Sequence, residues 1–175
     1  MDNRKYAIGI DFGTDSVRAL VVATDNGEEI ASCVSLYKRW SEGKYCNPKL
    51  NQYRQHPLDY IESLTEAVNG ALAQCDKAVS DGVVGLSFDC TASTPVLTDC
   101  EGTPLALLPE FKEDPDAMFI LWKDHTAIAE SDKINEVAKR WHTDYTRYGG
   151  GNHSCEWVWA KMLHSLRVAP HLREK

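Results

Sequence analysis

The chain has 175 residues, of which 43% are hydrophobic and 26% are charged, and its formal net charge at pH 7 is −7. This length is sufficient for a domain with a hydrophobic core, and the composition is that of a globular rather than a disordered chain. The negative charge argues against a nucleic-acid partner, because phosphate backbones are bound by clusters of Lys and Arg.

Neither a membrane span nor a disulfide framework is expected. No hydrophobic run approaches the roughly 20 residues that a membrane helix needs. The apolar stretch after Lys5 stops at Asp11, which is too short for a signal peptide, so we predict a cytoplasmic protein with no membrane partner. The 6 cysteines include no CxxC pair. We therefore expect reduced, mostly buried thiols.

Three strands are predicted at the start of the chain. Residues 6–12 and 17–24 are apolar and rich in β-branched side chains, and residues 28–37 alternate between apolar and polar. The Asp-Asn-Gly sequence at 25–27 indicates a turn, since Asn and Gly tolerate positive φ. Short turns make the three strands antiparallel.

The middle of the chain is predicted to contain a loop, a helix and two strands. Residues 38–55 are polar but carry aromatic side chains, so we expect an ordered loop, either beside a substrate or folded over the core. Pro57 is a favourable first helical residue, and apolar residues from 58 to 75 recur at helical spacing. Residues 83–88 are predicted as a buried strand, and residues 95–98 as a short one.

The last third of the chain is expected to alternate between loops and helices. In order, we predict a turn at 99–102, an acidic loop at 107–116, a buried strand at 117–122, a helix at 126–142 and a flexible glycine-rich loop at 143–153. Ser154 is expected to cap a final helix. The apolar side of that helix would consist of Cys155, Val158, Trp159, Met162 and Leu166. The order of elements predicts one α/β layered domain over residues 1–175.

The polar turn between the first two strands is the strongest candidate site. Asp11 ends an apolar strand, where a carboxylate is costly unless it meets a cation or hydrogen-bond donors. Gly13 permits a tight turn, and backbone N–H groups up to Ser16 can form an anion-binding concavity. The hydroxyls of Thr14 and Ser16 and the guanidinium of Arg18 suit phosphate oxygens. We interpret the turn as a site for nucleotide phosphates and magnesium, with an ordinary polar hairpin as the alternative.

Two other nucleotide-binding motifs do not apply. Asp11-Phe12-Gly13 matches the DFG triplet of protein kinases, but it comes too early to follow a Gly-rich loop, a β3 lysine and a catalytic loop. The sequence also contains no GxxxxGK[ST] P-loop.

Four segments together resemble the FGGY carbohydrate kinases, a family within the actin/hexokinase/Hsp70-like ATPase superfamily. They are the phosphate motif Ile10–Arg18, the stretch Gly85–Val96 continued by Asp99–Leu105, the Trp-x-Asp segment Leu121–Ala127, and Gly149–Leu166. The last is similar to the branch of the family that acts on ketopentoses. The motifs occur in the family's order along the whole chain.

The resemblance implies a fold, a reaction and a set of site residues. The fold is α/β of the ribonuclease-H-like type, with a mixed β-sheet flanked by helices, used twice around a cleft. The reaction is ATP-dependent phosphorylation of the terminal hydroxyl of a ketopentose such as L-ribulose, in arabinose breakdown. Asp11 is expected to hold Mg²⁺. The residues expected around ATP are Asp11, Gly13, Thr14, Asp15, Ser16 and Arg18. Those expected at the sugar are Asp89, Thr91, Ala92, Ser93, Trp122, Lys123 and Asp124.

Some of these assignments have alternatives. Asp15 departs from the Thr or Ser common at that position, so its carboxylate is expected to point away from the phosphates or to contact the metal. A small residue at Ala92 leaves room for a longer or branched substrate. Trp122 has the alternative of a core aromatic residue, and Asp124 that of an N-cap for the following helix.

The family's catalytic aspartate and its adenine-binding domain have no recognisable counterpart in this sequence. We therefore expect an N-terminal part of a longer kinase, without a catalytic base and inactive alone. Two further classes remain open. One is a non-catalytic sugar- or nucleotide-sensing module on the same fold, and the other is an ATPase of the actin or Hsp70 type. The preferred sugar and the oligomeric state, including a homodimer, also remain open.

Overall fold

The computed structural model describes residues 4–173, which form two compact units. The first unit contains the chain up to Glu42 together with Leu58–Thr91, and the second contains Gly43–Pro57 and the chain from Ala92 onward. The predicted phosphate residues all belong to the first unit, whereas most of the predicted sugar residues belong to the second.

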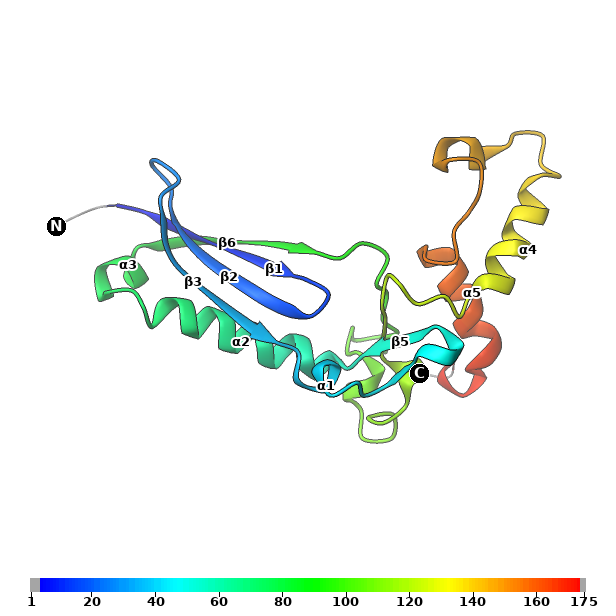
Figure 1. The fold of residues 1–175 in the computed structure, drawn as a ribbon, viewed down its shortest axis with the longest axis horizontal. Helices are drawn as coiled ribbons and strands as arrows, with labels where there is room; N and C mark the ends of the chain where they lie inside the picture. The colour runs from blue at the N-terminus through cyan, green and yellow to red at the C-terminus, as the bar shows by residue number, and fades with distance from the viewer. Residues whose placement is uncertain (1–3, 174–175) are drawn as a thin grey trace. The chain divides into compact units, whose positions relative to one another are not determined.

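A four-stranded sheet in the order β3-β2-β1-β6 forms the first unit (Figure 1). Its strands are β1 (Tyr6–Phe12), β2 (Ser16–Ala23), β3 (Glu29–Leu36) and β6 (Val83–Cys90). The first three are antiparallel, as predicted, and Gly27 takes a φ of 75° in the turn between β2 and β3. β6 is parallel to β1, because the chain crosses over through the helices α2 (Pro57–Leu72) and α3 (Lys77–Asp81).

Helix α2 covers one face of this sheet and builds the core of the unit (Figure 1). Ile8 and Val21 are paired neighbours on β1 and β2, and both are buried on that face. Ala67 of α2 is buried in the same cluster. The helix approaches β3 closely at Gly70, where an added Cβ would lie 2.5 Å from Sγ of Cys33. The predicted amphipathic helix is therefore confirmed, although the additional helix α3 was not predicted.

β6 is an edge strand, and the prediction that it is buried is wrong for this chain. Val84, Leu86 and Phe88 expose 63%, 58% and 60% of their surface. Within residues 4–173, β1 is the strand that pairs with β6, and no other pairs with its second edge. Apolar composition favours burial, but burial also requires a covering layer that the described residues do not provide.

The polar segment predicted as an irregular loop is ordered but contains regular elements. Helix α1 (Lys38–Ser41) follows β3. The strands β4 (Cys46–Asn47) and β5 (Gln52–Gln55) pair in antiparallel fashion around the 3₁₀ turn η1 (Pro48–Leu50). β5 also pairs with β7 (Phe119–Ile120), which brings the middle of the chain beside this hairpin in the second unit.

Several elements of the second unit are shorter than predicted. β7 is the regular part of the strand expected at 117–122, although Met118 and Leu121 beside it are buried as expected. Helix α4 (Ile128–Ala138) occupies only part of the predicted range 126–142. Residues 95–98 form no strand, apart from an isolated bridge at Thr98. Short 3₁₀ helices complete the unit: η2 (Leu105–Leu107), η3 (Pro115–Ala117), η4 (Tyr145–Gly149) and η5 (Pro170–Leu172).

The last helix, α5 (Val158–Val168), buries a different side from the one predicted. Ala160, Lys161 and Ser165 are buried, whereas Trp159 and Met162 expose 66% and 42% of their surface. The prediction of a helix from the spacing of these apolar residues is confirmed. The side of α5 that is buried is instead the side that carries Lys161, whose ammonium group donates to backbone carbonyl oxygens of other segments.

Two smaller expectations are also corrected. Ser154 does not cap α5, because Trp157 occupies the N-cap position without a side-chain cap, and the Ser154 hydroxyl instead accepts from the N–H of Glu156 at 3.1 Å. All six cysteines are free, as predicted, but none is fully buried: Cys33, Cys46, Cys75 and Cys155 are half-buried, and Cys90 and Cys100 are exposed. No helix within residues 4–173 is long and apolar enough to cross a membrane.

Candidate functional site

The predicted phosphate turn is a tight connection between β1 and β2. The N–H of Gly13 donates to the carbonyl oxygen of Ser16 at 2.9 Å, which closes the turn. Thr14 and Ser16 are half-buried and Asp15 is exposed, so the polar groups of the turn lie at an accessible surface. Such a surface is required of a site that receives phosphate from solution.

The side chain of Asp15 is held by the segment that follows β3. The indole N–H of Trp40 donates to Oδ1 of Asp15 at 2.6 Å, and the N–H of Tyr37 donates to the carbonyl oxygen of Asp15 at 3.0 Å. Whether this carboxylate points away from bound phosphates or contacts the metal stays a prediction. The contact with Trp40 ties the turn to α1.

Asp11, Arg18 and Asp89 share the face of the sheet opposite to α2. Ile10 is buried beneath α2, and successive side chains of a strand alternate between faces, so Asp11 projects from the open face. The sheet register places Arg18 on one side of Asp11 and Asp89 on the other. Nη1 of Arg18 lies 3.4 Å from Oδ2 of Asp11, and both side chains are about half exposed. Such an exposed pair contributes little to stability.

These carboxylates suit a magnesium ion that is shared with a nucleotide. In the described part of the chain, no three His, Cys, Asp or Glu side chains are grouped so that they could hold a metal ion. Asp11 and its register neighbour Asp89 provide two carboxylates, and Asp89 accepts from the N–H of Cys90 at 2.9 Å. Because Mg²⁺ in nucleotide sites takes one or two carboxylates and completes its shell with water and phosphate oxygens, these residues fit that ion.

The predicted sugar residues are divided between the two units. Asp89 ends β6, and the N–H of Thr91 donates to the carbonyl oxygen of Phe12 at 3.2 Å, which joins the end of β6 to the phosphate turn. The remaining five lie in the second unit: Ala92, Ser93, Trp122, Lys123 and Asp124.

Within the second unit, the two predicted sugar segments lie side by side. The N–H of Trp122 donates to Oγ1 of Thr94 at 3.1 Å, and the N–H of Ile120 donates to the carbonyl oxygen of Pro95 at 2.9 Å. The tertiary structure thus brings the segment 92–95 against the segment 120–124.

Lys161 of α5 links these same two segments, although the sequence pattern does not predict a role for it. Its side chain is 1% exposed, and Nζ donates to the carbonyl oxygens of Ser93 at 2.6 Å and Leu121 at 2.8 Å. A lysine in an amphipathic helix is normally expected to face water. The sequence contains one weak signal. Lys161 and Ser165 of α5, and Ala169 at its C-cap, recur every four residues, and all three are buried.

Both alternative interpretations of the Trp-x-Asp segment are wrong. Trp122 is 39% exposed and is therefore not a core residue of this chain. Asp124 does not cap the next helix, because α4 begins at Ile128 with Ala127 at the N-cap position and no side-chain cap. Asp124 instead accepts from Thr126 two residues later, in the local turn that Asp commonly forms.

The side chain of Asp124 is completely buried and serves the second unit structurally. Oδ2 accepts from the N–H of Tyr53 at 2.7 Å and from Nε of Arg54 at 3.0 Å. Oδ1 accepts from the N–H and the hydroxyl of Thr126 at 3.0 and 2.5 Å. Arg54, itself 1% exposed, also pairs with Asp116 at 3.1 Å. The predicted sugar contact of Asp124 stays a prediction.

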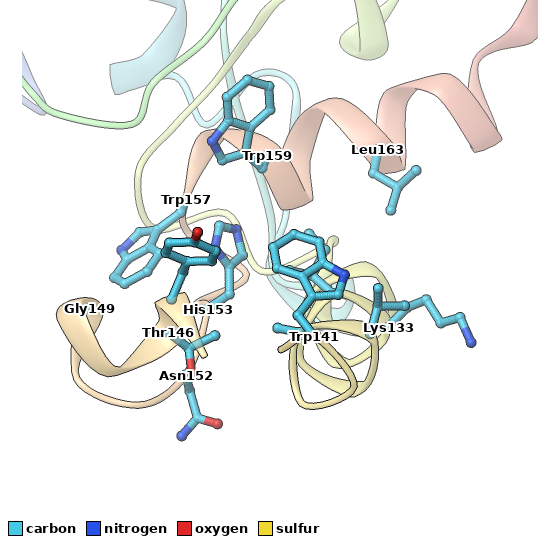
Figure 2. A pocket seen from close by; sticks show the side chains of 13 residues that line it. Lys133, Trp141, Thr146, Gly149, Asn152, His153, Trp157, Trp159 and Leu163 are labelled. Carbon is cyan, nitrogen blue, oxygen red and sulfur yellow. The ribbon is translucent and has the colours of Figure 1, made fainter. Parts of the chain in front are cut away.

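A cavity of about 620 Å³ lies elsewhere in the second unit, between α4, η4 and the start of α5 (Figure 2). Trp141, Trp157 and Trp159 contribute aromatic walls, and His153 packs edge-on against Trp157 with ring centroids 5.0 Å apart. Burial lowers the pKa of His153, so its imidazole is neutral at pH 7. None of the predicted site residues lines this cavity.

Comparison with known sequences identifies close relatives. A ribulokinase from Vibrio parahaemolyticus is 51% identical over 160 residues, which cover 91% of this chain and 28% of the relative. A ribulokinase from Halalkalibacterium halodurans is 40% identical over 171 residues, covering 94% of this chain and 30% of the relative. The chain therefore spans less than a third of the length of these relatives. No family model matches the chain.

Solved structures give the same result for the fold. A gluconate kinase from Lactobacillus acidophilus matches 98% of this chain, over 30% of its own, with a TM-score of 0.74 and 16% identity. A xylulose kinase from Bifidobacterium adolescentis matches 98%, over 31% of its own chain, with a TM-score of 0.69 and 15% identity. The chain thus has the actin/hexokinase-type fold of the sugar kinases, in which helices flank a mixed sheet.

The sequence likeness is more specific than the likeness in fold. Over nearly its whole length the chain is similar to a part of the ribulokinases. The resemblance predicted from the four motif segments is confirmed.

Proposed function

We propose that this chain is the N-terminal part of an ATP-dependent kinase that phosphorylates the terminal hydroxyl of L-ribulose or a similar ketopentose. The observation that carries the proposal is the accessible polar turn from Asp11 to Arg18, at the end of a central strand of a sugar-kinase fold. The 51% identity to a ribulokinase supports the choice of a ketopentose.

The residues of the turn have distinct tasks in this proposal. Asp11 holds magnesium together with the nucleotide, and the hydroxyls of Thr14 and Ser16 donate to phosphate oxygens. Arg18, which lies beside Asp11, adds positive charge near the phosphates. Bound ATP supplies the phosphoryl group. Because phosphoryl transfer depends chiefly on positioning and electrostatic stabilisation, a turn that orients these groups is what the reaction needs.

The sugar site is assigned to the segments around Ser93 and Trp122. We propose that the sugar contacts this wall through Ser93, Trp122 and Lys123, and that the small Ala92 leaves room for the sugar chain. Nζ of Lys123 lies 4.7 Å from the ring centroid of Tyr53, which orients its charge by a cation–π contact. The catalytic base and the adenine site are proposed to lie in the rest of the longer enzyme.

A coupled ADP-release assay with a panel of pentuloses and pentitols tests the proposal. The longer enzyme is expected to release ADP with L-ribulose, and the 175-residue chain alone is expected to show no turnover. Turnover by the chain alone would overturn its assignment as a part that lacks the base. ATP hydrolysis that no sugar stimulates would favour an ATPase of the actin or Hsp70 type, and sugar binding without turnover would favour a sensor.

A further inference from the structure

Lys161 gathers four backbone carbonyl groups around one ammonium group. Its Nζ lies 2.6 Å from the carbonyl oxygen of Ser93, 2.8 Å from that of Leu121, 3.3 Å from that of Trp122 and 3.4 Å from that of Ile120. An ammonium group has three N–H donors, so the two longer contacts share one donor. The carbonyl oxygen of Ser93 belongs to one segment, and those of residues 120–122 belong to another that is more than 25 residues later in the sequence.

The buried ammonium group is charged at neutral pH. Burial lowers the pKa of Lys161 to about 8, while the nearby carboxylates of Asp124 and Glu156 raise it and Arg54 lowers it. The charged form therefore predominates at pH 7. A charge that is 1% exposed is retained only where acceptors surround it, and the carbonyl oxygens of the two segments are those acceptors.

The backbone that Lys161 holds on one side is strained. Ser93 has a φ of 55°, in the left-handed region that favours glycine. A residue with a side chain persists in this conformation only when its surroundings hold it there. The shortest of the four contacts, from Nζ of Lys161 to the carbonyl oxygen of Ser93, supplies such a restraint.

We propose that Lys161 is a positioning residue for the sugar site, whose ammonium group fixes the backbone at Ser93 against the backbone at Trp122. Lys161 touches neither sugar nor nucleotide, and it acts through the two wall segments that it joins. The assignment of these segments to a sugar rests on the proposed function. The link between them is a property of the chain itself and can be tested separately.

The lysine side-chain ¹⁵N–¹H spectrum of the 175-residue chain at pH 7 tests the link. A buried, hydrogen-bonded ammonium group exchanges its protons slowly and gives a signal, whereas exposed lysines exchange too fast to be seen. We expect a signal that Lys161→Met removes and that Lys139→Met, at an exposed lysine after α4, retains. Absence of any slowly exchanging lysine signal from the wild-type chain would overturn the link, and that result needs no folded Lys161→Met variant.

Steady-state kinetics of the longer enzyme test the role at the sugar site. Because a displaced wall weakens sugar binding but leaves the phosphate turn intact, Lys161→Met is expected to raise KM for the pentulose by about tenfold or more, with less than about a twofold change in KM for ATP. Lys139→Met is the control, with both constants unchanged. A merely structural lysine would lower the melting temperature without this split between the two KM values, and that result would overturn the proposal.

The two experiments separate the inference from the function on which it rests. A wild-type enzyme that phosphorylates no pentulose would refute the proposed function. The ammonium spectrum would still decide whether Lys161 joins the two segments.

Discussion

Asp11 and Asp124 are the same residue type placed in opposite surroundings. The side chain of Asp11 is 48% exposed at the end of β1, with Arg18 at 3.4 Å as its partner. The side chain of Asp124 is 0% exposed and accepts four hydrogen bonds, one of them from the buried Arg54. An exposed carboxylate that contributes little to stability is available to bind a ligand. A buried carboxylate whose oxygens already accept four hydrogen bonds stabilises the fold instead. The two substitutions to Asn therefore separate activity from stability.

Asp11→Asn is expected to impair catalysis while leaving stability nearly unchanged. Loss of the metal-binding carboxylate should lower kcat/KM of the longer enzyme by roughly a hundredfold or more. ATP-dependent pentulose phosphorylation and thermal unfolding of the same preparation measure both quantities. Asp132→Asn, at an exposed position of α4, is the control. Full activity of the Asp11→Asn variant would contradict the assignment of Asp11 to magnesium.

Asp124→Asn is expected to destabilise the second unit strongly. The substitution removes the buried partner of Arg54 and leaves Asp116, whose side chain is 30% exposed, as its remaining carboxylate. Breaking a buried ion pair typically costs about 3–5 kcal/mol. Urea denaturation of the 175-residue chain, compared with the Asp132→Asn variant, measures the change in the free energy of unfolding. A loss smaller than about 1 kcal/mol would show that the pair at 3.0 Å contributes no more than a surface ion pair.

At the scale of elements, close packing of α2 on β3 explains a glycine inside a long helix. Glycine lowers helix stability relative to alanine, yet a Cβ at Gly70 would lie 2.5 Å from Sγ and 3.2 Å from Cβ of Cys33. The close approach of the two elements requires the missing side chain.

The effect of substituting Gly70 on stability should therefore depend on the residue at position 33. Gly70→Ala is expected to destabilise the wild-type chain by about 1–3 kcal/mol through overpacking. In a Cys33→Ala background the clash with sulfur disappears and only the 3.2 Å contact with Cβ remains, so the same substitution should cost at least about 1 kcal/mol less. A double-mutant cycle in urea measures both values. Equal effects in the two backgrounds would exclude the contact as the reason for the glycine.

Helices α4 and α5 are joined by a buried carboxylate whose effect depends on pH. The side chain of Glu130 on α4 is 7% exposed and accepts from Nδ1 of His164 and Nη1 of Arg167 on α5, each at 3.1 Å. Burial raises the pKa of Glu130, but the hydrogen bonds from His164 and Arg167 outweigh it and hold the pKa below its ordinary value of 4.5. A group with a lowered folded-state pKa stabilises the fold above the unfolded-state pKa.

The lowered folded-state pKa of Glu130 predicts how the free energy of unfolding responds to acid. Above pH 4.5 Glu130 contributes its full stabilisation, and the contribution is lost as the pH falls from 4.5 through the folded-state pKa. The difference in the free energy of unfolding between wild type and Glu130→Gln should therefore be largest near pH 7 and shrink in acid. Glu101→Gln, in an exposed turn, should show no such trend. A difference that is independent of pH would contradict the ion-pair account.

At the scale of the whole molecule, the chain exposes large apolar side chains of the kind that folded proteins usually bury. Leu86 and Phe88 of β6 expose 58% and 60% of their surface, and Trp159 of α5 exposes 66%. The ribulokinase relatives are more than three times as long as the segment they share with this chain. In the proposed longer enzyme, further chain would cover these surfaces.

The chain studied alone is expected to self-associate through β6. An unpaired strand edge with apolar side chains is a template for pairing with another copy. Sedimentation velocity over a range of concentrations should detect this, and Leu86→Lys should weaken it by about tenfold or more. Ile61→Lys, at an isolated exposed residue of α2, is the matched control. A chain that stays monomeric at high concentration would show that the edge is protected in another way.

Local sequence signals determined the elements whose causes are local. The hairpin of β1 and β2, the turn at Gly27 and the helix α2 follow from spacing and from the backbone preferences of a few neighbouring residues, and the motif order predicted the likeness to sugar kinases. The tertiary structure decided which side chains are buried. Lys161 lies 68 residues from the carbonyl oxygen of Ser93 that it binds, and Asp124 lies 70 residues from Arg54. The exposure of Leu86 and Trp122 depends in the same way on distant layers. Burial is set by contacts that no local window of sequence contains.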